Sequence, residues 1–295
     1  MADIPTFYPE LFDTSFGKVL QQESPILAPT MTQRDISGDR HWYNIMEDVS
    51  MSDITTRKGD TPDGDFEGYK VWHSQTPREI VVSFDENDAR NLGTIVLPTS
   101  DSVMNQAMAR NRKLDDVLIS ALGGSRVTGT SGETSTAFPS GQKIAKDYVQ
   151  TGSAATCGLT ISKLRRAKYL MDTGQVPKGE RYLACGAAQI QDLLSTTEVT
   201  SADYNVIRAL VQGDINTFMG FTFVQTERLV TLETDVRACY AYHKKAIRFS
   251  AVDRKTHMDW LPTKRHRLQI RTVEIMGAMR YLNEMVVQIA CDETP

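Results

Sequence analysis

The stretch SADYNVIRALVQGDINTFMGFTFVQTERL, from Ser201 to Leu229, decides the fold. Its apolar spacing predicts a helix over Asp203–Gln212, and Gly213 follows as a stop signal. After a turn, residues Gly220–Val224 have the composition of a short aromatic strand. The stretch contains no reactive constellation, so it predicts a structural unit without chemistry of its own.

Helices and strands continue on both sides of this stretch. The longest predicted helix runs over Asp101–Leu122, because apolar residues recur near every 3.6 positions and Gly123 and Gly124 end the pattern. A second helix is predicted over Thr160–Thr173, with Thr160 as its N-cap. The shorter predicted elements are a strand at Arg181–Cys185, a helix at Ala187–Leu194 and a strand at Arg237–Tyr242. This mixture predicts an α+β fold.

The end of the chain alternates apolar and polar residues. Leu268 and Ile270 follow this pattern, and so do Val287, Ile289 and Cys291. Period-two alternation is typical of half-buried strands, so we expect long antiparallel strands to close the chain.

The first 84 residues have no evident core of their own. Residues 1–36 contain four prolines and little periodicity, which predicts an extended arm. Residues 37–84 predict a long hairpin, whose strands are His41–Met46, Tyr69–His73 and Glu79–Phe84 and whose turn is Lys58–Asp65. A hairpin of this length is not stable alone, so we expect it to lie on another surface.

The segment from Gly123 to Gly141 is rich in Gly, Ser and Thr and allows two interpretations. A phosphate-binding loop of the GxxxxGK[ST] type would make the chain a phosphate-binding enzyme, but Gly124 is followed by Gly129 and Thr130 with no lysine. We therefore predict a flexible surface loop.

Four segments together carry a resemblance to a known family. Besides Ser201–Leu229, they are Pro77–Gly124, which contains Leu97-Pro98-Thr99-Ser100 and the Asp115-Asp116 pair, Leu159–Leu194 and Val287–Glu293. Each is an ordinary amphipathic element, but their order and spacing resemble those of tailed-bacteriophage major capsid proteins. The resemblance covers roughly residues 77–295.

The resemblance implies the tailed-phage major capsid protein fold. Its expected parts are an N-terminal arm at residues 1–36, an extended hairpin loop at 37–84, a peripheral domain at 85–150 and 262–295 with a spine helix at 101–122, and an axial domain at 151–261. The implied function is self-assembly into hexamers and pentamers of an icosahedral phage head that encloses double-stranded DNA. The alternative is the shell protein of a cellular nanocompartment, which shares this fold.

The resemblance also implies partners and a location. The partners are other copies of the chain, scaffolding and portal proteins, decoration proteins as a further option, and packaged double-stranded DNA bound without sequence preference on the inner face. The implied location is the capsid of the virion, assembled in the host cytoplasm.

Composition sets limits on the function. The 295 residues are 40% hydrophobic, enough for about two domains with real cores. The formal net charge of −4 gives no sign of a dedicated nucleic-acid-binding domain. The cysteines Cys157, Cys185, Cys239 and Cys291 form no CxxC pair, so we expect buried reduced thiols. We expect neither a secretory signal nor a membrane span, because no basic and apolar leader occurs and no apolar run reaches about 18 residues.

We expect no catalysis, no cofactor and no metal site. The five histidines show no metal-binding spacing, and no GxSxG motif occurs. Asp115 and Asp116 are adjacent on the predicted helix, so their carboxylates do not face each other.

Two sets of basic residues allow a functional interpretation. The candidates for contact with DNA are Lys244, Lys245, Arg248 and Lys264–Arg267. The alternative that we favour is a solvated strand face with salt bridges between subunits. Some relatives crosslink their subunits through a hairpin lysine, and Lys58 and Lys70 are the candidates here. Nothing in the sequence around either lysine predicts the desolvated pocket that a crosslink requires, so we expect ordinary solvated lysines.

Four aromatic residues of the hairpin are the candidate intersubunit contacts. Trp42, Tyr43, Tyr69 and Trp72 cannot all find a core within one thin hairpin, and aromatic residues concentrate binding energy at interfaces. Packing on their own subunit is the alternative. The interface hypothesis predicts that Trp72→Ala blocks assembly while the soluble subunit stays folded.

Overall fold

The computed structural model describes residues 22, 24–51, 53, 57, 59, 67–84, 101–150, 156–195, 217–264 and 266–293. Several predicted features lie outside these residues. They are the helix at 203–212, most of the arm and of the hairpin turn, Lys58 and Arg265.

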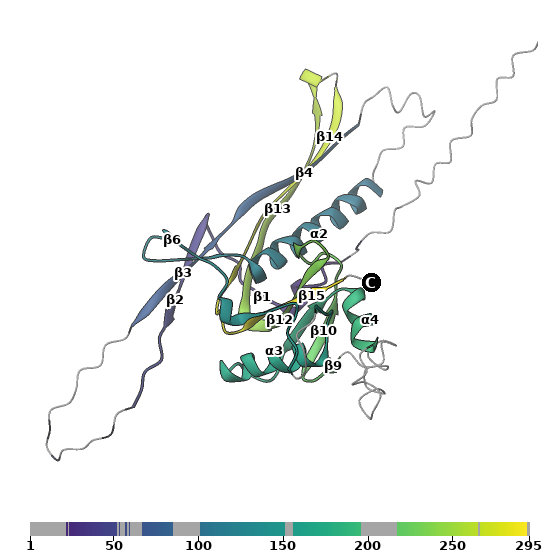
Figure 1. Ribbon diagram of the computed structural model, residues 1–295. Helices are drawn as coiled ribbons and strands as arrows, with labels where there is room; N and C mark the ends of the chain where they lie inside the picture. The colour runs from purple at the N-terminus through teal and green to yellow at the C-terminus, as the bar shows by residue number, and fades with distance from the viewer. Residues whose placement is uncertain are drawn as a thin grey trace, which may run out of the picture.

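A seven-stranded sheet forms the compact part of the molecule (Figure 1), in the strand order β7-β15-β12-β8-β10-β9 with β11 beside β12. β12 (Val236–His243) is antiparallel to both β15 (Val286–Asp292) and β8 (Arg181–Cys185). β8 is parallel to β10 (Phe221–Gln225). The short strands are β7 (Lys143–Ile144), β9 (Thr217–Phe218) and β11 (Thr231–Glu233).

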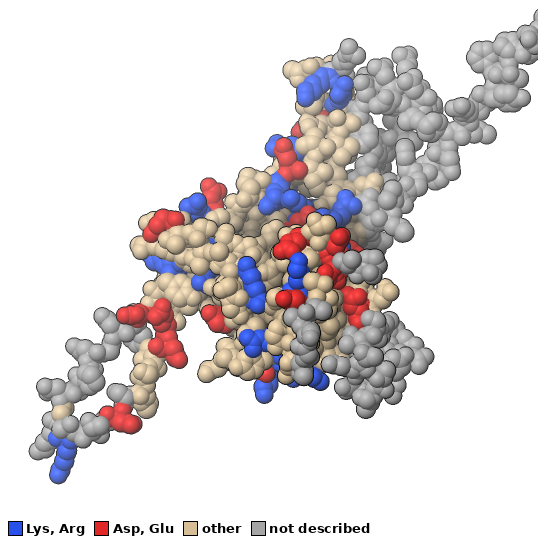
Figure 2. All heavy atoms as spheres, viewed as in Figure 1, with Lys and Arg blue, Asp and Glu red and all other residues tan. Residues whose placement is uncertain are grey.

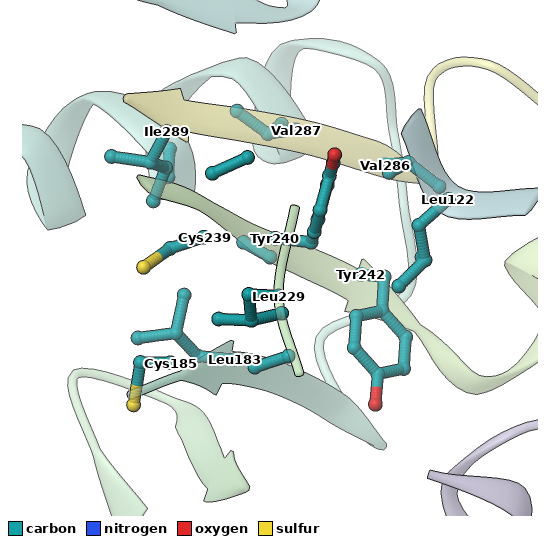
Figure 3. Close-up of a cluster of buried hydrophobic side chains, with 14 of the residues drawn as sticks. Leu122, Leu183, Cys185, Leu229, Cys239, Tyr240, Tyr242, Val286, Val287 and Ile289 are labelled. Atoms are coloured by element: carbon teal, nitrogen blue, oxygen red, sulfur yellow. The ribbon is translucent and has the colours of Figure 1, made fainter. Parts of the chain in front are cut away.

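The main hydrophobic core is built on this sheet. Nearly every residue of β12 is buried, which shows that both its faces are covered and explains why its sequence is a continuous apolar run. Leu183 of β8 and Ile289 of β15 lie on one face of the sheet, and Tyr240 of β12 lies on the other (Figure 3). Two helices, α3 (Ile161–Thr173) and α4 (Ala187–Ser195), also contribute to this core.

A four-stranded sheet in the order β1-β13-β14-β4 forms a long projection. We call this sheet the arm, and it is distinct from the predicted N-terminal arm at residues 1–36. The antiparallel hairpin of β13 (Ile247–Leu261) and β14 (Arg267–Arg280) projects beyond the compact part, and the turn η5 (Pro262–Lys264) lies at its tip (Figure 1). β4 (Thr76–Phe84) pairs with β14 on one side. β1 (Thr32–Gln33) pairs with β13 on the other, at Arg248 and Phe249 only.

Helix α2 (Asp101–Gly123) confirms the longest predicted helix and lies along the arm. Arg110 Nη2 and Nε donate to the two Glu274 carboxylate oxygens of β14 at 2.5 and 2.7 Å. At the other end, Arg280 donates to the carbonyls of Leu122 and Gly124 at 2.9 and 2.8 Å. Because the last carbonyls of a helix lack partners within it, Arg280 satisfies groups that would otherwise be buried unpaired.

A third sheet in the order β2-β3-β5-β6 corrects the predicted flexible loop. Its strands are β2 (Arg40–Met46), β3 (Gly68–Ser74), β5 (Arg126–Thr128) and β6 (Thr134–Thr136). The Gly-rich segment thus folds as a hairpin that extends the predicted one. Gly129 and Gly132 have φ of 100° and 76°, values that glycine adopts without strain, so these glycines form the turn between β5 and β6.

The prediction that Glu79–Phe84 returns along the hairpin is wrong. β2 and β3 pair along their full length, and the chain then leaves them and pairs with β14 instead. The alternation of Ile80 and Val82 predicted a strand correctly but did not specify its partner.

Two further features were not expected from the sequence. β13 is fifteen residues long, but its outer half is too polar to alternate clearly. Within the predicted arm, Leu27 and Met31 are buried in the main core, and Asp115 on α2 accepts hydrogen bonds from the Ile26 and Leu27 N–H groups at 3.0 and 3.2 Å. This segment is therefore anchored on its own subunit.

The other predicted elements of the described chain are confirmed. α3 begins after Thr160, whose Oγ1 accepts from the Lys163 N–H at 3.4 Å. The predicted strands and helix correspond to β8, β10, β12, β14, β15 and α4. All four cysteines are unpaired thiols, three of them buried and Cys157 half-buried.

Candidate assembly surfaces

The β2–β3 hairpin has two faces of different character. In its antiparallel register, Tyr43 lies opposite Val71 and Ile45 opposite Tyr69, while Trp42 lies opposite Trp72. Because side chains alternate along a strand, the first two pairs share one face and the tryptophan pair lies on the other. The structure thus divides the four predicted contact residues between two surfaces.

Tyr43 packs on its own subunit. Its ring meets that of Tyr281 edge to face at 6.2 Å between centroids. The Arg248 guanidinium lies 4.4 Å from the Tyr43 centroid and 3.5 Å from that of Tyr281, which makes a cation–π contact with both rings.

Tyr69 belongs to the same inner face. It packs with Ile45, Val71 and Met279 in a small second hydrophobic cluster, and the Arg126 guanidinium lies 5.2 Å from its ring centroid. Tyr43 and Tyr69 therefore pack the β2–β3 hairpin against residues of β13 and β14.

Trp72 is held by the β5–β6 turn. Its Nε1–H donates to the Gly129 carbonyl at 2.7 Å. A Cβ at Gly132 would come within 3.1 Å of the indole, so the glycine backbone lies directly against the ring. Trp72 thus has an apolar neighbour and a hydrogen-bond partner within its own subunit.

Trp42 differs from the other three aromatic residues. It is 44% exposed, and its main neighbour is Lys70, whose Nζ lies 4.6 Å from the ring centroid. Met46 lies on the same face and is 74% exposed. The outer face of the hairpin therefore carries exposed apolar surface next to the Lys70 ammonium, which already contacts the Trp42 ring.

A second exposed apolar surface lies on the arm. Met258 and Trp260 of β13 are 53% and 60% exposed, and sequence reasoning did not identify either as a contact. A tryptophan and a methionine two positions apart in a polar strand were the only available signal, since β13 itself was not predicted.

The structure does not bring the basic DNA-contact candidates together. Lys244 pairs with Glu180 at 3.0 Å, and Arg248 is stacked on two tyrosines. Lys264 lies at the arm tip, roughly 45 Å away along β13 at about 3.3 Å per residue. Figure 2 shows Lys and Arg spread along the arm and over the compact part rather than in one patch.

The described residues offer little reactive chemistry. Burial raises the pKa of the Cys185 thiol to about 12, and a hydrogen bond that the Cys239 thiol makes to Cys291, together with burial, raises the pKa of Cys239. Both are therefore protonated and poorly nucleophilic near neutral pH. Within the part of the chain that the structure describes, no group of three or more His, Cys, Asp or Glu side chains is placed to hold a metal ion. No described helix is long and apolar enough to cross a membrane.

The geometry defines a protein with two projecting sheets and exposed aromatic side chains on each, the character of a structural assembly subunit. The model of the phage capsid protein family matches residues 4–293. The chain therefore belongs to the phage capsid protein family, and it is a structural protein of a phage head. This family match favours a phage capsid over the shell of a cellular nanocompartment.

Solved structures share the fold at low sequence identity. The capsid of cyanophage Pam1 is 14% identical and matches with a TM-score of 0.72 over 99% of each chain. The capsid of Ralstonia phage GP4 is 9% identical, with a TM-score of 0.71 over 100% of this chain and 99% of that one. A structure from Mycobacterium phage Che8 is 16% identical, with a TM-score of 0.68 over 97% and 98%. No curated protein sequence gives a significant match.

Proposed function

We propose that the chain assembles into hexamers and pentamers that close an icosahedral head around double-stranded DNA, with the β2–β3 hairpin bridging to the next subunit. The observation that carries this proposal is the exposed outer face of the hairpin, with Trp42 44% and Met46 74% exposed. Exposed apolar surface on a projecting element is typical of an interaction site.

Charge complementarity supports an acceptor surface on the neighbouring subunit. The hairpin continues past its strands with exposed Glu47, Asp48 and Glu67, and acidic side chains gather there in Figure 2. A groove of about 400 Å³ between α2 and the arm is lined by three cations, Arg78, Arg110 and Lys113, and by two carboxylates, Glu79 and Glu274. Because Glu274 pairs with Arg110, the cations left over are Arg78 and Lys113, against Glu79. Opposite charges on two surfaces favour their encounter and fix their register.

The proposed parts are the arm at 1–36, the hairpin loop at 37–84, the peripheral domain at 85–150 and 262–295, and the axial domain at 151–261. The last segment of the peripheral domain contributes to two sheets, through β14 and β15. A hinge between peripheral and axial parts would therefore have to bend within this segment.

The proposed partners are other copies of the chain, scaffolding and portal proteins, with decoration proteins as an option, and packaged DNA bound through its phosphates. The proposed role is structural and not enzymatic, and no cofactor is required. The proposed setting is the virion, with assembly in the host cytoplasm.

Negative-stain electron microscopy of the chain expressed alone tests this function. We expect closed shells from the wild type, and loss or malformation of shells in Trp42→Ala with the soluble subunit still folded. Asn44→Ala, on the same exposed face, is the matched control and should assemble normally. Trp42 is a better test residue than Trp72, whose contacts with Gly129 and Gly132 tie it to the subunit's own fold. Normal shells from Trp42→Ala would remove the hairpin from the proposal.

A further inference from the structure

The outer half of β13 leaves one strand edge open. β14 pairs with β13 out to Leu261, but on the other side β1 reaches only Arg248 and Phe249. Among the described residues no strand pairs with this edge beyond that point, and the eight residues 253–260 are all exposed. An open edge presents unpaired N–H and C=O groups that can extend the sheet with a further strand.

We propose that this edge, residues 255–259, pairs with the same edge of a second copy of the chain in an antiparallel strand pair about a local two-fold axis. This inference deepens the proposed function, because it rests on self-assembly and names one contact of the shell.

Strand pleating limits the possible registers. Directly opposite residues of an antiparallel pair lie on the same face of the sheet. A two-fold axis perpendicular to the sheet keeps each side chain on its own face, so a symmetric pair must be centred on a residue that lies opposite its own copy. Thr256, His257 and Met258 are the central choices in this segment.

The charges select His257 as the centre. In that register Lys255 lies opposite Asp259 of the second copy, and the same pair occurs again across the axis. Neither Lys255 nor Asp259 has an ion-pair partner among the described side chains of its own subunit, so both remain available. A pair centred on Thr256 would place Lys255 opposite His257, and one centred on Met258 would place Lys255 opposite Leu261 and Asp259 opposite His257. Only the register centred on His257 places a lysine opposite a carboxylate. Cross-strand opposite charges stabilise a sheet and like charges destabilise it.

The apolar residues fit the same register. Met258 pairs with Ile270, and Trp260 with Leu268, in the β13–β14 ladder, so all four lie on one face of the arm. Ile270 and Leu268 are buried, whereas Met258 and Trp260 at the open edge are 53% and 60% exposed. A second copy paired along this edge would continue the same face and place its Thr256 opposite Met258, while Trp260 lies just beyond the paired segment. The proposal thus accounts for the exposed Met258 of β13.

The bulge at Asp253 sets where such pairing begins. The β13–β14 register shifts between Val252 and Lys255, and Asp253 has φ of 55°. A bulge bends its strand and interrupts regular pairing, whereas the ladder is regular from Lys255 to Leu261. The regular segment is the part that holds the complementary charges.

Disulfide trapping tests the register in the full chain. A cysteine at the centre of the pair lies opposite its own copy, so His257→Cys should give a covalent dimer on denaturing gels after mild oxidation with diamide. Ser83→Cys, exposed on the opposite edge strand β4, is the matched control and should stay monomeric. The wild type, treated in parallel, reports any background from the native cysteines.

Charge reversal in the His257→Cys background tests the Lys255–Asp259 pairs. Lys255→Glu and Asp259→Lys should each reduce the dimer yield several-fold, because each places like charges opposite one another. The double variant should restore it. Absence of a dimer band, equal dimers from Ser83→Cys, or failure of the double variant to restore the yield would overturn the pairing.

The two proposals fail differently in this experiment. Shells that form without the dimer band would overturn the β13 pairing and leave the proposed function standing. The dimer is also measured on concentrated unassembled chain. A wild type that forms no shells would count against the proposed function, while the dimer band would still decide the pairing.

Discussion

At the scale of single residues, buried cations hold backbone carbonyls together in this fold. Lys163 is fully buried, and its three N–H donors are shared among four carbonyl oxygens that lie 2.6 to 2.9 Å from Nζ, those of Lys146, Cys157, Gly158 and Ala290. Arg280 serves the end of α2 in the same way. Sequence patterns assign lysine and arginine to the surface, so neither role was predictable before the carbonyls were placed around them.

Arg280→Met should lower the free energy of unfolding by about 3 kcal/mol, because it leaves several buried carbonyls at the end of α2 without a donor. Urea unfolding of the soluble subunit measures the change. Arg165→Met, at an exposed position of α3, is the matched control and should stay within about 0.5 kcal/mol of the wild type. Equal stability of both variants would show that the carbonyls find other partners.

His73 should make stability depend on pH. It is buried at the junction of two sheets, with Nε2 3.3 Å from Ser250 Oγ, and burial lowers its pKa below the ordinary 6.5. The unfolded chain therefore takes up a proton at a higher pH than the folded chain, so the free energy of unfolding falls as the pH drops below 6.5.

The measurement is urea unfolding of the wild type and His73→Asn at several pH values between about 5 and 7. The variant should show a shallower pH dependence. Some dependence should remain, because burial also lowers the pKa of His243. His257→Asn, on the exposed arm, is the matched control for replacing a histidine. If the free energy of unfolding of His73→Asn varied with pH as steeply as that of the wild type, His73 would not be a source of the pH dependence.

At the scale of elements, the local patterns predicted most helices and strands but not their partners. The 3.6-residue repeat of α2 and the Thr160 cap of α3 are local properties, and both elements form as expected. β4 was predicted as a strand, yet it pairs with β14 almost two hundred residues away. Alternation fixes which residues share a face, whereas pairing depends on which other face is available.

The anchoring of the N-terminal segment around Leu27 on α2 gives a prediction at this scale. Asp115→Ala removes the acceptor of the Ile26 and Leu27 N–H groups and should lower the free energy of unfolding by about 2 to 3 kcal/mol. It should also speed amide exchange at these two residues.

Asp116→Ala is the matched control for this anchoring. Its carboxylate pairs with Arg228 at 2.8 Å near the surface, an interaction worth less than about 1 kcal/mol. Hydrogen exchange with mass spectrometry compares the two variants. Equal exchange near Leu27 in both would show that Asp115 does not hold the segment.

At the scale of the whole molecule, folding and assembly use different surfaces. The core gathers residues from all of the compact part, whereas Trp42 and Trp260 stay exposed on two separate projections. Changes at the projections should therefore affect assembly without affecting the fold.

Trp260→Ser tests this separation. The free energy of unfolding of the subunit should change by less than about 0.5 kcal/mol, because the side chain is mostly exposed. The critical concentration for shell formation, measured by sedimentation, should rise roughly tenfold or more if the residue is buried between subunits. Ser83→Ala, on the opposite edge strand, is the matched control. An unchanged critical concentration would place Trp260 outside the interfaces.

The sequence by itself determined the fold class, the long helix, most strands and the family resemblance, because these follow from local periodicity and from the order of elements along the chain. It also identified the four hairpin aromatics as a group. Only the tertiary structure separated Trp42 from Tyr43, Tyr69 and Trp72, and revealed the exposed edge of β13. The physical reason is that exposure depends on which distant segments cover a residue, and residues such as Gly132, Tyr281 and Arg248 come from elsewhere in the chain.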